Sequence, residues 1–455
     1  MTRRLSALLV LLALLAAACG SRVNKSDAAN AQNAQTGGST TTVAGSDGSS
    51  SGGTTFGTLP SPCGPGNAHA ATDHGVTTDA IKIGTISDPG GPVPGLDQGI
   101  FDSMEAFVDW CNDQGGINGR KLDLTLRDAK LVQFRERVLD ACKTDFALVG
   151  GGGALDYLGA QDIVDCGLVN VPGFTVSSQA ADSDRMYQPM PNPPNSYLVT
   201  AGRWIERTHP GVVKHAASVY SNIEVGQVQQ GRHQEAYTQL GYKFVYATGV
   251  PVANVNYGPV VVAMRNAGVK YFTFTSSYEE LVNFQRAMRQ QNWKPEVSDL
   301  ETNFYNKDYP KVGGEAAEGS YVRLTMWPFE EADQNKATRD FLSIMKKYKP
   351  NGKIELLGMQ AFDAGLLFAT AAKKLGDNVT RDRLLSALSK IHEWDGGGLS
   401  GVQDPGNNLS GTCQIVMQVH NGGFRRIYPD HGFACPKDGR VTLYGDYGKG
   451  AKAKN

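Results

Sequence analysis

Two glycine runs have spacings that could bind a phosphate or another anion. The run GGGLSG at 396–401 matches G-x-G-x-x-G, but it follows no predicted strand and opens no predicted helix. We interpret it as a loop. The run at 150–153 does follow a predicted strand and precede a helix, so its backbone N–H groups could hold an anion. A tight turn that needs glycine for packing explains the same run equally well.

The residue patterns of common enzymes and metal sites are missing from the sequence. It contains no GxSxG, no GxxxxGK[ST] and no HExxH. Of the eight histidines only His69 and His74 lie close together, and no CxxC accompanies them. We therefore predict no catalytic residue, no metal and no cofactor. A hydrolase is a disfavoured alternative, because no nucleophile–base pair or pair of carboxylates can be recognised.

The stretch at 79–128 shows which elements would position a site. Ile81, Ile83 and Ile86 predict a short strand, which leads into a Gly/Pro-rich loop at 88–95. A helix follows, with apolar residues at helical spacing: Phe101, Met104, Phe107, Val108 and Cys111. Two glycines at 115–116 end this helix, and 121–127 predicts the next strand. The loop thus lies at the carboxyl end of a strand, where open α/β sheets bind ligands.

Alternating strands and helices continue along the chain and predict parallel sheets with right-handed crossovers. The predicted helices include 132–143, 155–165, 196–207, 226–240, 257–267, 278–291, 335–348, 359–375 and 381–391. The predicted strands include 145–150, 168–171, 216–220, 242–247 and 270–275, with a closing hairpin of 413–419 and 424–428.

Three segments read as crossings between two lobes: 187–195, 321–327 and 396–408. Lobe one would comprise 79–190 plus 328–398, and lobe two would comprise 191–327 plus 409–445. A ligand would lie between the lobes, which would close on it by a hinge motion.

The N-terminus indicates export. Arg3 and Arg4 precede an apolar run at 5–17, so 1–18 is predicted to be a signal peptide. Small residues running into Cys19 resemble a bacterial lipobox, although Ala16 stands where Leu is usual. This resemblance implies lipidation of Cys19, and an ordinary cleaved signal is the alternative. Residues 19–58 are rich in Ser, Thr and Gly and predict a flexible tether.

The remaining six cysteines are even in number and lie in a predicted oxidising compartment. We favour the pair Cys142–Cys166, since each residue ends a helix just before a strand. We also favour Cys413–Cys435, which bracket the closing hairpin, and this leaves Cys63–Cys111.

Charge and hydropathy argue against nucleic-acid binding and against a membrane-spanning helix beyond the signal peptide. Without 1–18 the chain has 42 basic residues, which is 44 minus two, against 45 acidic ones, a net charge near −3. No basic stripe points to nucleic acid. No second apolar run is long enough to span a bilayer.

The chain resembles type I periplasmic binding proteins of the branched-chain amino acid (leucine/isoleucine/valine-binding) group. The resemblance rests on GGINGR at 115–120, IKIGTISDPGGPV at 81–93, Asp128, PGFT at 172–175 and GEAAEGSYV at 314–322, and it covers about 79–430. It implies an α/β fold of two Rossmann-like lobes with parallel sheets joined by three crossover strands. It also implies the receptor component of an ABC importer.

The resemblance implies how a ligand would be held. Hydroxyls and backbone N–H groups after strands three and four would bind a carboxylate, with Thr175 among them. From lobe two, Glu301 would pair with a cation and Tyr278 would cover an apolar or cationic group. The candidate ligand-binding residues are Gly91, Pro92, Gly153, Ala154, Leu155, Phe174, Thr175, Tyr220, Tyr278 and Glu301.

Two departures bear on the ligand. Ala154 stands where relatives have a small hydroxyl residue, and Phe174 where they have a small residue. A missing donor weakens carboxylate binding, whereas an added aromatic ring contributes stacking area. An aromatic, amide-like or larger cationic ligand is therefore favoured over a plain α-amino acid. Phe174 and Tyr220 could instead be core residues, and Glu301 a solvated surface carboxylate.

We expect an exported, non-enzymatic receptor that is lipid-anchored to the outer side of the cell membrane. It would bind a small polar solute, such as an amino acid or an amide compound, and deliver it to an ABC permease. We expect a monomer. The alternative is a lipid-anchored sensor that signals through a partner protein.

Overall fold

The first sheet is built around the isoleucine-rich strand that the sequence predicts. In this computed structural model, which describes residues 55–92, 94–252 and 256–453, β3 (Ala80–Ser87) lies between β4 (Lys121–Asp128) and β5 (Ala147–Val149). β6 (Val169–Val171) follows β5, and the pairings β3–β4, β3–β5 and β5–β6 are parallel. The predicted signal peptide, Cys19 and most of the tether lie outside the described residues.

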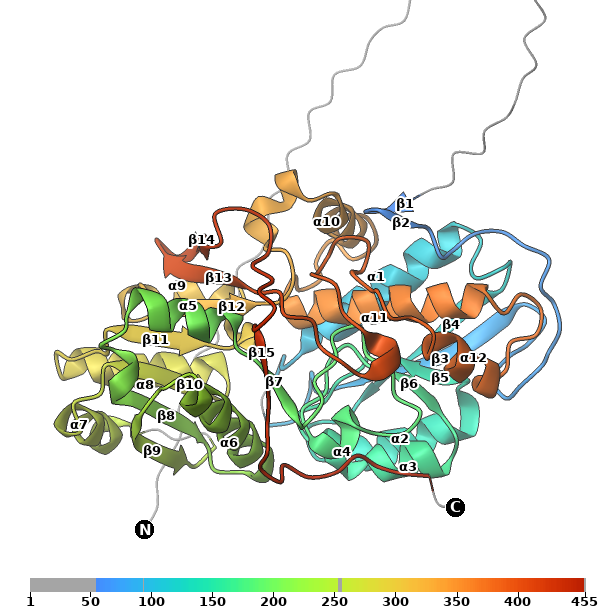
Figure 1. The fold of residues 1–455 in the computed structure, drawn as a ribbon. Coiled ribbons are helices and arrows are strands. Elements are labelled where there is room, and N and C mark those ends of the chain that lie inside the picture. Colours follow the sequence, from blue (N-terminus) through green and yellow to red (C-terminus); the bar gives the residue numbers. More distant parts are fainter. Residues whose placement is uncertain (1–54, 93, 253–255, 454–455) are drawn as a thin grey trace, which may run out of the picture. The chain divides into compact units, whose positions relative to one another are not determined.

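Helices pack around this sheet (Figure 1). They are α1 (Gln98–Asp113), α2 (Phe134–Thr144), α3 (Ala160–Asp165), α4 (Ser178–Ala181), α10 (Lys336–Tyr348), α11 (Leu356–Lys373) and α12 (Arg381–Leu388), with the 3₁₀ turns η1 (Asp156–Leu158) and η5 (Phe329–Gln334). The predicted apolar face of α1 is confirmed, since Met104, Phe107 and Cys111 are fully buried. We call this part of the molecule lobe one.

The second sheet has the strand order β14-β13-β12-β11-β10-β8-β9 within the described residues. Its strands are β8 (Ala216–Ser221), β9 (Phe244–Val250), β10 (Tyr271–Thr275), β11 (Val297–Leu300), β12 (Tyr321–Leu324), β13 (Ile415–His420) and β14 (Gly423–Tyr428). Strands β8 to β12 pair in parallel, whereas β13 and β14 form the antiparallel hairpin that the sequence predicts.

The part built on the second sheet is lobe two. Its helices are α5 (Thr200–Thr208), α6 (Glu224–Gln239), α7 (Gly258–Asn266), α8 (Tyr278–Gln290) and α9 (Asp308–Gly313), with 3₁₀ turns η2 (Val213–His215), η3 (Thr302–Phe304) and η4 (Gly314–Ala316). Another 3₁₀ turn, η6 (Pro405–Asn407), lies in the segment predicted as the third crossing. The α/β class with parallel sheets is confirmed, while the residue boundaries of the lobes stay a prediction.

Two predicted helices differ from the structure. The helix predicted at 155–165 is broken at Gly159 into η1 and α3, and the Asp156 carboxylate accepts backbone bonds from another loop. The helix predicted from residue 196 begins at Thr200, because β7 (Ser196–Leu198) pairs with β15 (Arg440–Thr442). The partner strand of β7 lies too far along the chain for a local pattern to reveal it.

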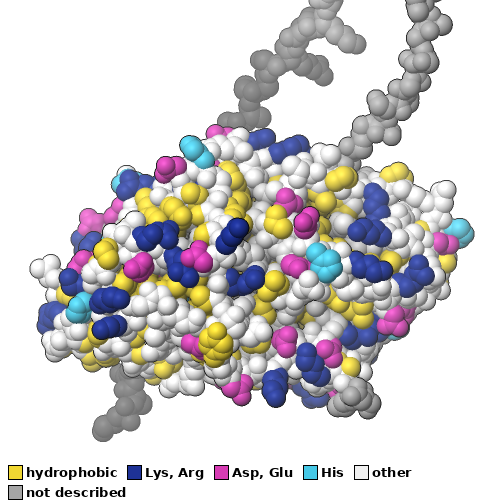
Figure 2. Space-filling view, viewed as in Figure 1, with side chains coloured by type: hydrophobic (Ala, Val, Ile, Leu, Met, Phe, Trp, Pro, Cys, Tyr) yellow, Lys and Arg dark blue, Asp and Glu magenta, His cyan; other side chains and the backbone are white. Residues whose placement is uncertain are grey.

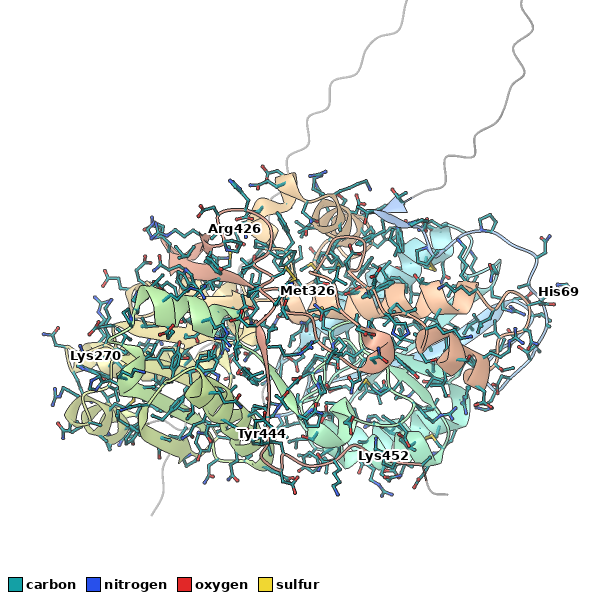
Figure 3. All side chains as sticks on the ribbon, viewed as in Figure 1. His69, Lys270, Met326, Arg426, Tyr444 and Lys452 are labelled. Carbon is teal, nitrogen blue, oxygen red and sulfur yellow. A yellow bond between two sulfur atoms is a disulfide. The ribbon has the colours of Figure 1, made fainter. Side chains whose placement is uncertain are left out.

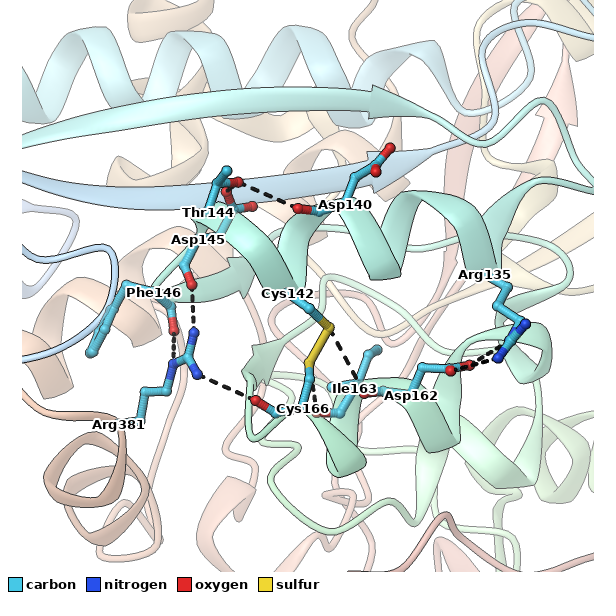
Figure 4. Close-up of a disulfide and its surroundings, with 10 residues drawn as sticks. All are labelled: Arg135, Asp140, Cys142, Thr144, Asp145, Phe146, Asp162, Ile163, Cys166 and Arg381. Atoms are coloured by element: carbon cyan, nitrogen blue, oxygen red, sulfur yellow. Dashed lines mark hydrogen bonds and ion pairs between the residues drawn. A yellow bond between two sulfur atoms is a disulfide. The ribbon is translucent and has the colours of Figure 1, made fainter.

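The favoured cysteine pairs are confirmed. The described residues contain the disulfides Cys63–Cys111, Cys142–Cys166 and Cys413–Cys435. Figure 4 shows Cys142 of α2 joined to Cys166 after α3, next to the Arg135–Asp162 ion pair. The first disulfide attaches the lead-in segment, which carries β1 (Thr55–Phe56) and β2 (Leu59–Pro60), to α1. Phe56 of this segment is fully buried against Trp110 and Phe362.

The described residues include no helix that is long and apolar enough to cross a membrane. They also contain no group of three or more His, Cys, Asp or Glu side chains arranged to hold a metal ion. On the face shown in Figure 2, acidic and basic side chains are intermixed.

Candidate ligand-binding site

The loop after β5 is held in place by an acidic side chain that follows the neighbouring strand, β3. The Asp88 carboxylate, directly after β3, accepts N–H bonds from Ala154 at 2.8 Å and from Leu131 at 2.8 Å. Asp88 is 1 % exposed, and this burial raises the pKa of its carboxyl group. Asp88 therefore joins the loops that follow β4 and β5. Sequence reasoning missed it, although an acidic residue at the end of a buried strand was a usable signal.

Phe174 covers the glycine run of the same loop. A Cβ atom placed on Gly152 would lie 2.2 Å from the Phe174 ring, so the ring rests directly on this backbone. The Gly152 N–H donates to the Ile86 carbonyl at 3.0 Å. At this position the packing explanation of the glycine run is favoured over an open anion site. Ala154 and Leu155 are half-buried beside it, and Gly153 is buried.

The loop after β6 is also held in place by a buried carboxylate. The Asp156 carboxylate accepts N–H bonds from Val176 at 2.7 Å and from Ser177 at 3.0 Å. Burial raises the pKa of Asp156 to about 6, against these hydrogen bonds, which lower it. The Thr175 hydroxyl donates to the Gln188 side chain at 2.9 Å and is buried. A cavity of about 20 Å³ bordered by Gly152, Phe174 and Thr175 has room for roughly one water molecule.

Glu301 lies at the carboxyl end of β11 and is engaged by lobe two itself. Its Oε1 accepts a hydrogen bond from the Tyr197 hydroxyl at 2.9 Å and lies 3.7 Å from the Arg323 guanidinium. Arg323 is buried and also pairs with Asp299 at 3.1 Å. Glu301 keeps 30 % of its side chain exposed, so it remains available to a ligand as a partly neutralised carboxylate.

The other candidate residues are distributed over different elements of both lobes. The Tyr220 ring lies against Gly249 of β9, toward the edge of the second sheet. Tyr278 opens α8, and burial together with the Glu279 charge raises its pKa. Gly91 and Pro92 are exposed, and Gly91 has a φ of 85° and contacts the Lys130 backbone. The structure therefore brings Gly153, Ala154, Phe174 and Thr175 together, while the contribution of the remaining candidates stays a prediction.

A pocket lies between the two lobes beside these loops. Its volume is about 140 Å³. Lobe one contributes Tyr157, Ser177, Ser178 and Gln179, α6 of lobe two contributes Glu224, Val225 and Val228, and the C-terminal segment contributes Asp446, Tyr447 and Gly448. We call it the inter-lobe pocket. None of the residues chosen from the sequence lines it, and its C-terminal wall comes from a segment with no recognisable motif.

The C-terminal segment connects the lobes. We call residues 440–453 the C-terminal strap; it begins with β15 on β7 and ends beside α4 and α3 (Figure 1). On lobe two, the Tyr447 hydroxyl donates to the Glu235 carboxylate of α6 at 2.6 Å. On lobe one, the Ser178 hydroxyl donates to the Tyr447 carbonyl.

The far end of the strap is held on lobe one. Ala451 is buried, donates its N–H to the Gln179 carbonyl at 2.9 Å and accepts from the Asp184 N–H at 2.8 Å. Lys452 donates to the Asp182 carbonyl at 2.9 Å; Figure 3 labels it together with exposed Tyr444. The strap therefore forms one wall of the inter-lobe pocket and contacts both of the other walls.

Comparison with known proteins decides the family. The family described as periplasmic binding protein matches residues 80–423 of the chain. The chain belongs to the periplasmic binding protein family. Its members are extracytoplasmic binding proteins, and the family implies a small-molecule ligand and an ABC permease as partner. The C-terminal strap lies beyond the matched residues.

Solved structures share the type I periplasmic binding fold. A leucine-binding protein from Thermotoga maritima is 15% identical, with a TM-score of 0.65, over 79% of this chain and 99% of that one. A fatty acid ABC transporter substrate-binding protein from Thermomonospora curvata is 16% identical, with a TM-score of 0.66, over 81% and 94%.

A solute-binding protein of an ABC transporter from Rhodopseudomonas palustris BisB5, solved with 3,4-dihydroxybenzoic acid, is 17% identical, with a TM-score of 0.64, over 81% and 99%. No curated protein matches the chain in sequence. These likenesses establish the fold of the chain and leave its solute open.

Proposed function

We propose that the chain is the receptor of an ABC importer and that it binds a small polar solute in the inter-lobe pocket. The observation that supports this most directly is that lobe one, α6 of lobe two and the strap each contribute a wall to the same pocket. Ligands of two-lobed proteins bind at such interfaces, where closure can enclose them. The receptor acts without a catalytic step.

We further propose that the receptor is a lipid-anchored monomer. The proposal rests on the N-terminal sequence, in which an apolar run leads through small residues to Cys19 and then to a tether rich in Ser, Thr and Gly. Such a tether would let the two lobes reach a permease from the outer surface of the membrane. Metabolic labelling with a fatty acid, lost on Cys19→Ala, tests the anchor.

Thermal-shift screening of the purified chain tests the binding function. The ligand panel contains amino acids, amides, polyamines and aromatic acids. A bound ligand at 100 times its Kd adds about 2.7 kcal/mol of stability, which raises the melting temperature measurably. Isothermal titration calorimetry then gives the stoichiometry, which we expect to be one per chain.

A pair of matched variants locates the site. Val228→Trp places an indole in the inter-lobe pocket, whereas Val262→Trp places the same group on an exposed face of α7. We expect the first variant to abolish the ligand-induced shift and the second to keep it. An unchanged shift in Val228→Trp would show that the solute binds elsewhere.

A further inference from the structure

Two buried carboxylates of lobe one occupy backbone donors that a solute carboxylate would otherwise use. Loops at the carboxyl ends of parallel strands hold anions through free backbone N–H groups. Here the N–H of Ala154, after β5, donates to Asp88, and the N–H groups of Val176 and Ser177, after β6, donate to Asp156. These three donors are directed at charges that belong to the protein.

Two further groups of these loops also have partners within the protein. The Thr175 hydroxyl donates to Gln188 inside lobe one, and the Gly152 N–H donates to Ile86. The Phe174 ring rests on Gly152, so a solute cannot approach that part of the backbone without displacing the ring. Asp88 and Asp156 are 1 % and 4 % exposed, so neither can swing into solvent to release its donors.

The acidic groups gathered near Asp97, which directly precedes α1, disfavour a further anion beside them. Removal from water and the neighbouring carboxylates of Glu355, Asp88 and Glu279 raise the pKa of Asp97 to about 8, while the Lys353 ammonium opposes this shift. Glu279 belongs to α8 of lobe two, so these acidic groups come from both lobes. The buried Arg232 guanidinium of α6 donates to the Asn192 side chain and to the carbonyls of Pro193 and Ser196. The buried Arg323 guanidinium is paired with Asp299 and lies beside Glu301.

We infer that the receptor takes a solute without a free carboxylate, which it recognises through ammonium, amide or hydroxyl groups that donate hydrogen bonds. The inference rests on the proposed function. Acceptors for such a solute line the inter-lobe pocket on both lobes: the exposed Glu224 carboxylate of α6 on lobe two, and the oxygen of the Ser178 hydroxyl on lobe one. A preference for solutes without a carboxylate distinguishes this chain from receptors whose loops bind the carboxylate of an amino acid.

Matched ligand pairs test the inference. Each pair shares a side group and differs by one carboxylate: arginine and agmatine, lysine and cadaverine, phenylalanine and phenylalaninamide, 4-hydroxybenzoate and 4-hydroxybenzamide. Calorimetry and thermal shift with the full chain give the Kd of each member. We expect the member without the carboxylate to bind at least tenfold more tightly in every pair that binds. A pair in which the carboxylate member binds equally well or better overturns the inference.

Variants of Asp88 and Asp156 test whether these internal carboxylates cause the preference against a solute carboxylate. Asp88→Asn and Asp156→Asn keep the shape of the side chain and remove its charge, so they should reduce the preference against the carboxylate member at least fivefold. Asp123→Asn on the exposed side of β4 is the matched control and should leave the preference unchanged. A preference that survives both charge removals refutes the role of the internal carboxylates. The ligand pairs still decide the ligand class if either variant fails to fold.

The same measurements separate this inference from the proposed function. If a carboxylate member binds best and Val228→Trp abolishes that binding, the receptor function stands and the inference falls. If neither member of any pair nor any compound of the screening panel binds, the receptor function itself is refuted, and the inference with it.

Discussion

Replacing Gly450 by alanine should release the C-terminal strap from lobe one. A Cβ atom at this position would lie 1.6 Å from the Asp182 carbonyl oxygen, which is a backbone atom and cannot move aside cheaply. The added methyl group therefore has to displace Ala451, the next residue. Ala451 makes two backbone hydrogen bonds, with Gln179 and Asp184, and its methyl group is buried.

The expected loss follows from these contacts. Two hydrogen bonds at about 1 kcal/mol each, with about 0.8 kcal/mol for the buried methyl, give a loss of about 3 kcal/mol. The unfolding entropy of roughly 400 residues, at about 2.1 cal/mol/K per residue, is about 0.8 kcal/mol/K. The apparent melting temperature of the Gly450→Ala variant should therefore fall by about 3–4 °C.

Differential scanning calorimetry measures this loss, and Gly211→Ala is the matched control because a Cβ atom there has no neighbour within 4 Å. Hydrogen exchange adds a local readout, since the Asp184 amide donates to Ala451 and should exchange faster only in the Gly450→Ala variant. Equal melting temperatures and equal exchange rates in the two variants would refute the close seating of the strap on lobe one.

Further predictions concern the core of lobe one. Replacing Cys63 and Cys111 by alanine opens a loop of sequence separation 48 and should cost about 4 kcal/mol of unfolding free energy in urea; a loss below about 1 kcal/mol would contradict the loop-closure argument. Arg127→Met leaves the buried Asp145 carboxylate without its ion pair and should cost about 3–5 kcal/mol, whereas a neutral effect would show that Asp145 finds another partner. Burial raises the pKa of Asp363 from 3.8 to about 8, so its contribution to stability is complete below pH 3.8 and is lost as the pH rises toward 8. The stability of Asp363→Asn relative to the wild type should therefore increase by about 4 kcal/mol between pH 5 and pH 9, and a constant difference would contradict the shift.

The elements that sequence reasoning found are those whose local pattern agrees with their final environment. The strand containing Ile81 and Ile83 and the amphipathic face of α1 carry strong periodicity, and both are buried as expected. The strand β7 was missed because its partner is 242 residues away, with Arg440 opposite Leu198. No periodicity within 196–207 distinguishes a strand that depends on such a distant partner from the start of a helix.

The site was less predictable than the fold. The resemblance identified the loops after β5 and β6 but assigned Thr175 and the backbone donors to a ligand. In the structure Thr175 and the donors of Ala154, Val176 and Ser177 have partners inside lobe one. A carboxylate that holds a loop and a carboxylate that binds a ligand look alike in sequence. They differ only in the folded chain, where backbone N–H groups lie within 3 Å of the first kind.

The C-terminal strap also limits how far the lobes can separate. Leu443 is buried on lobe two and Gly450 is buried on lobe one, so the chain between them spans seven residue steps. A fully extended chain covers at most about 3.5 Å per residue, or about 24 Å over this segment. While both ends of this segment stay bound to their lobes, their separation cannot exceed that distance. The open receptor therefore samples a bounded range of hinge angles.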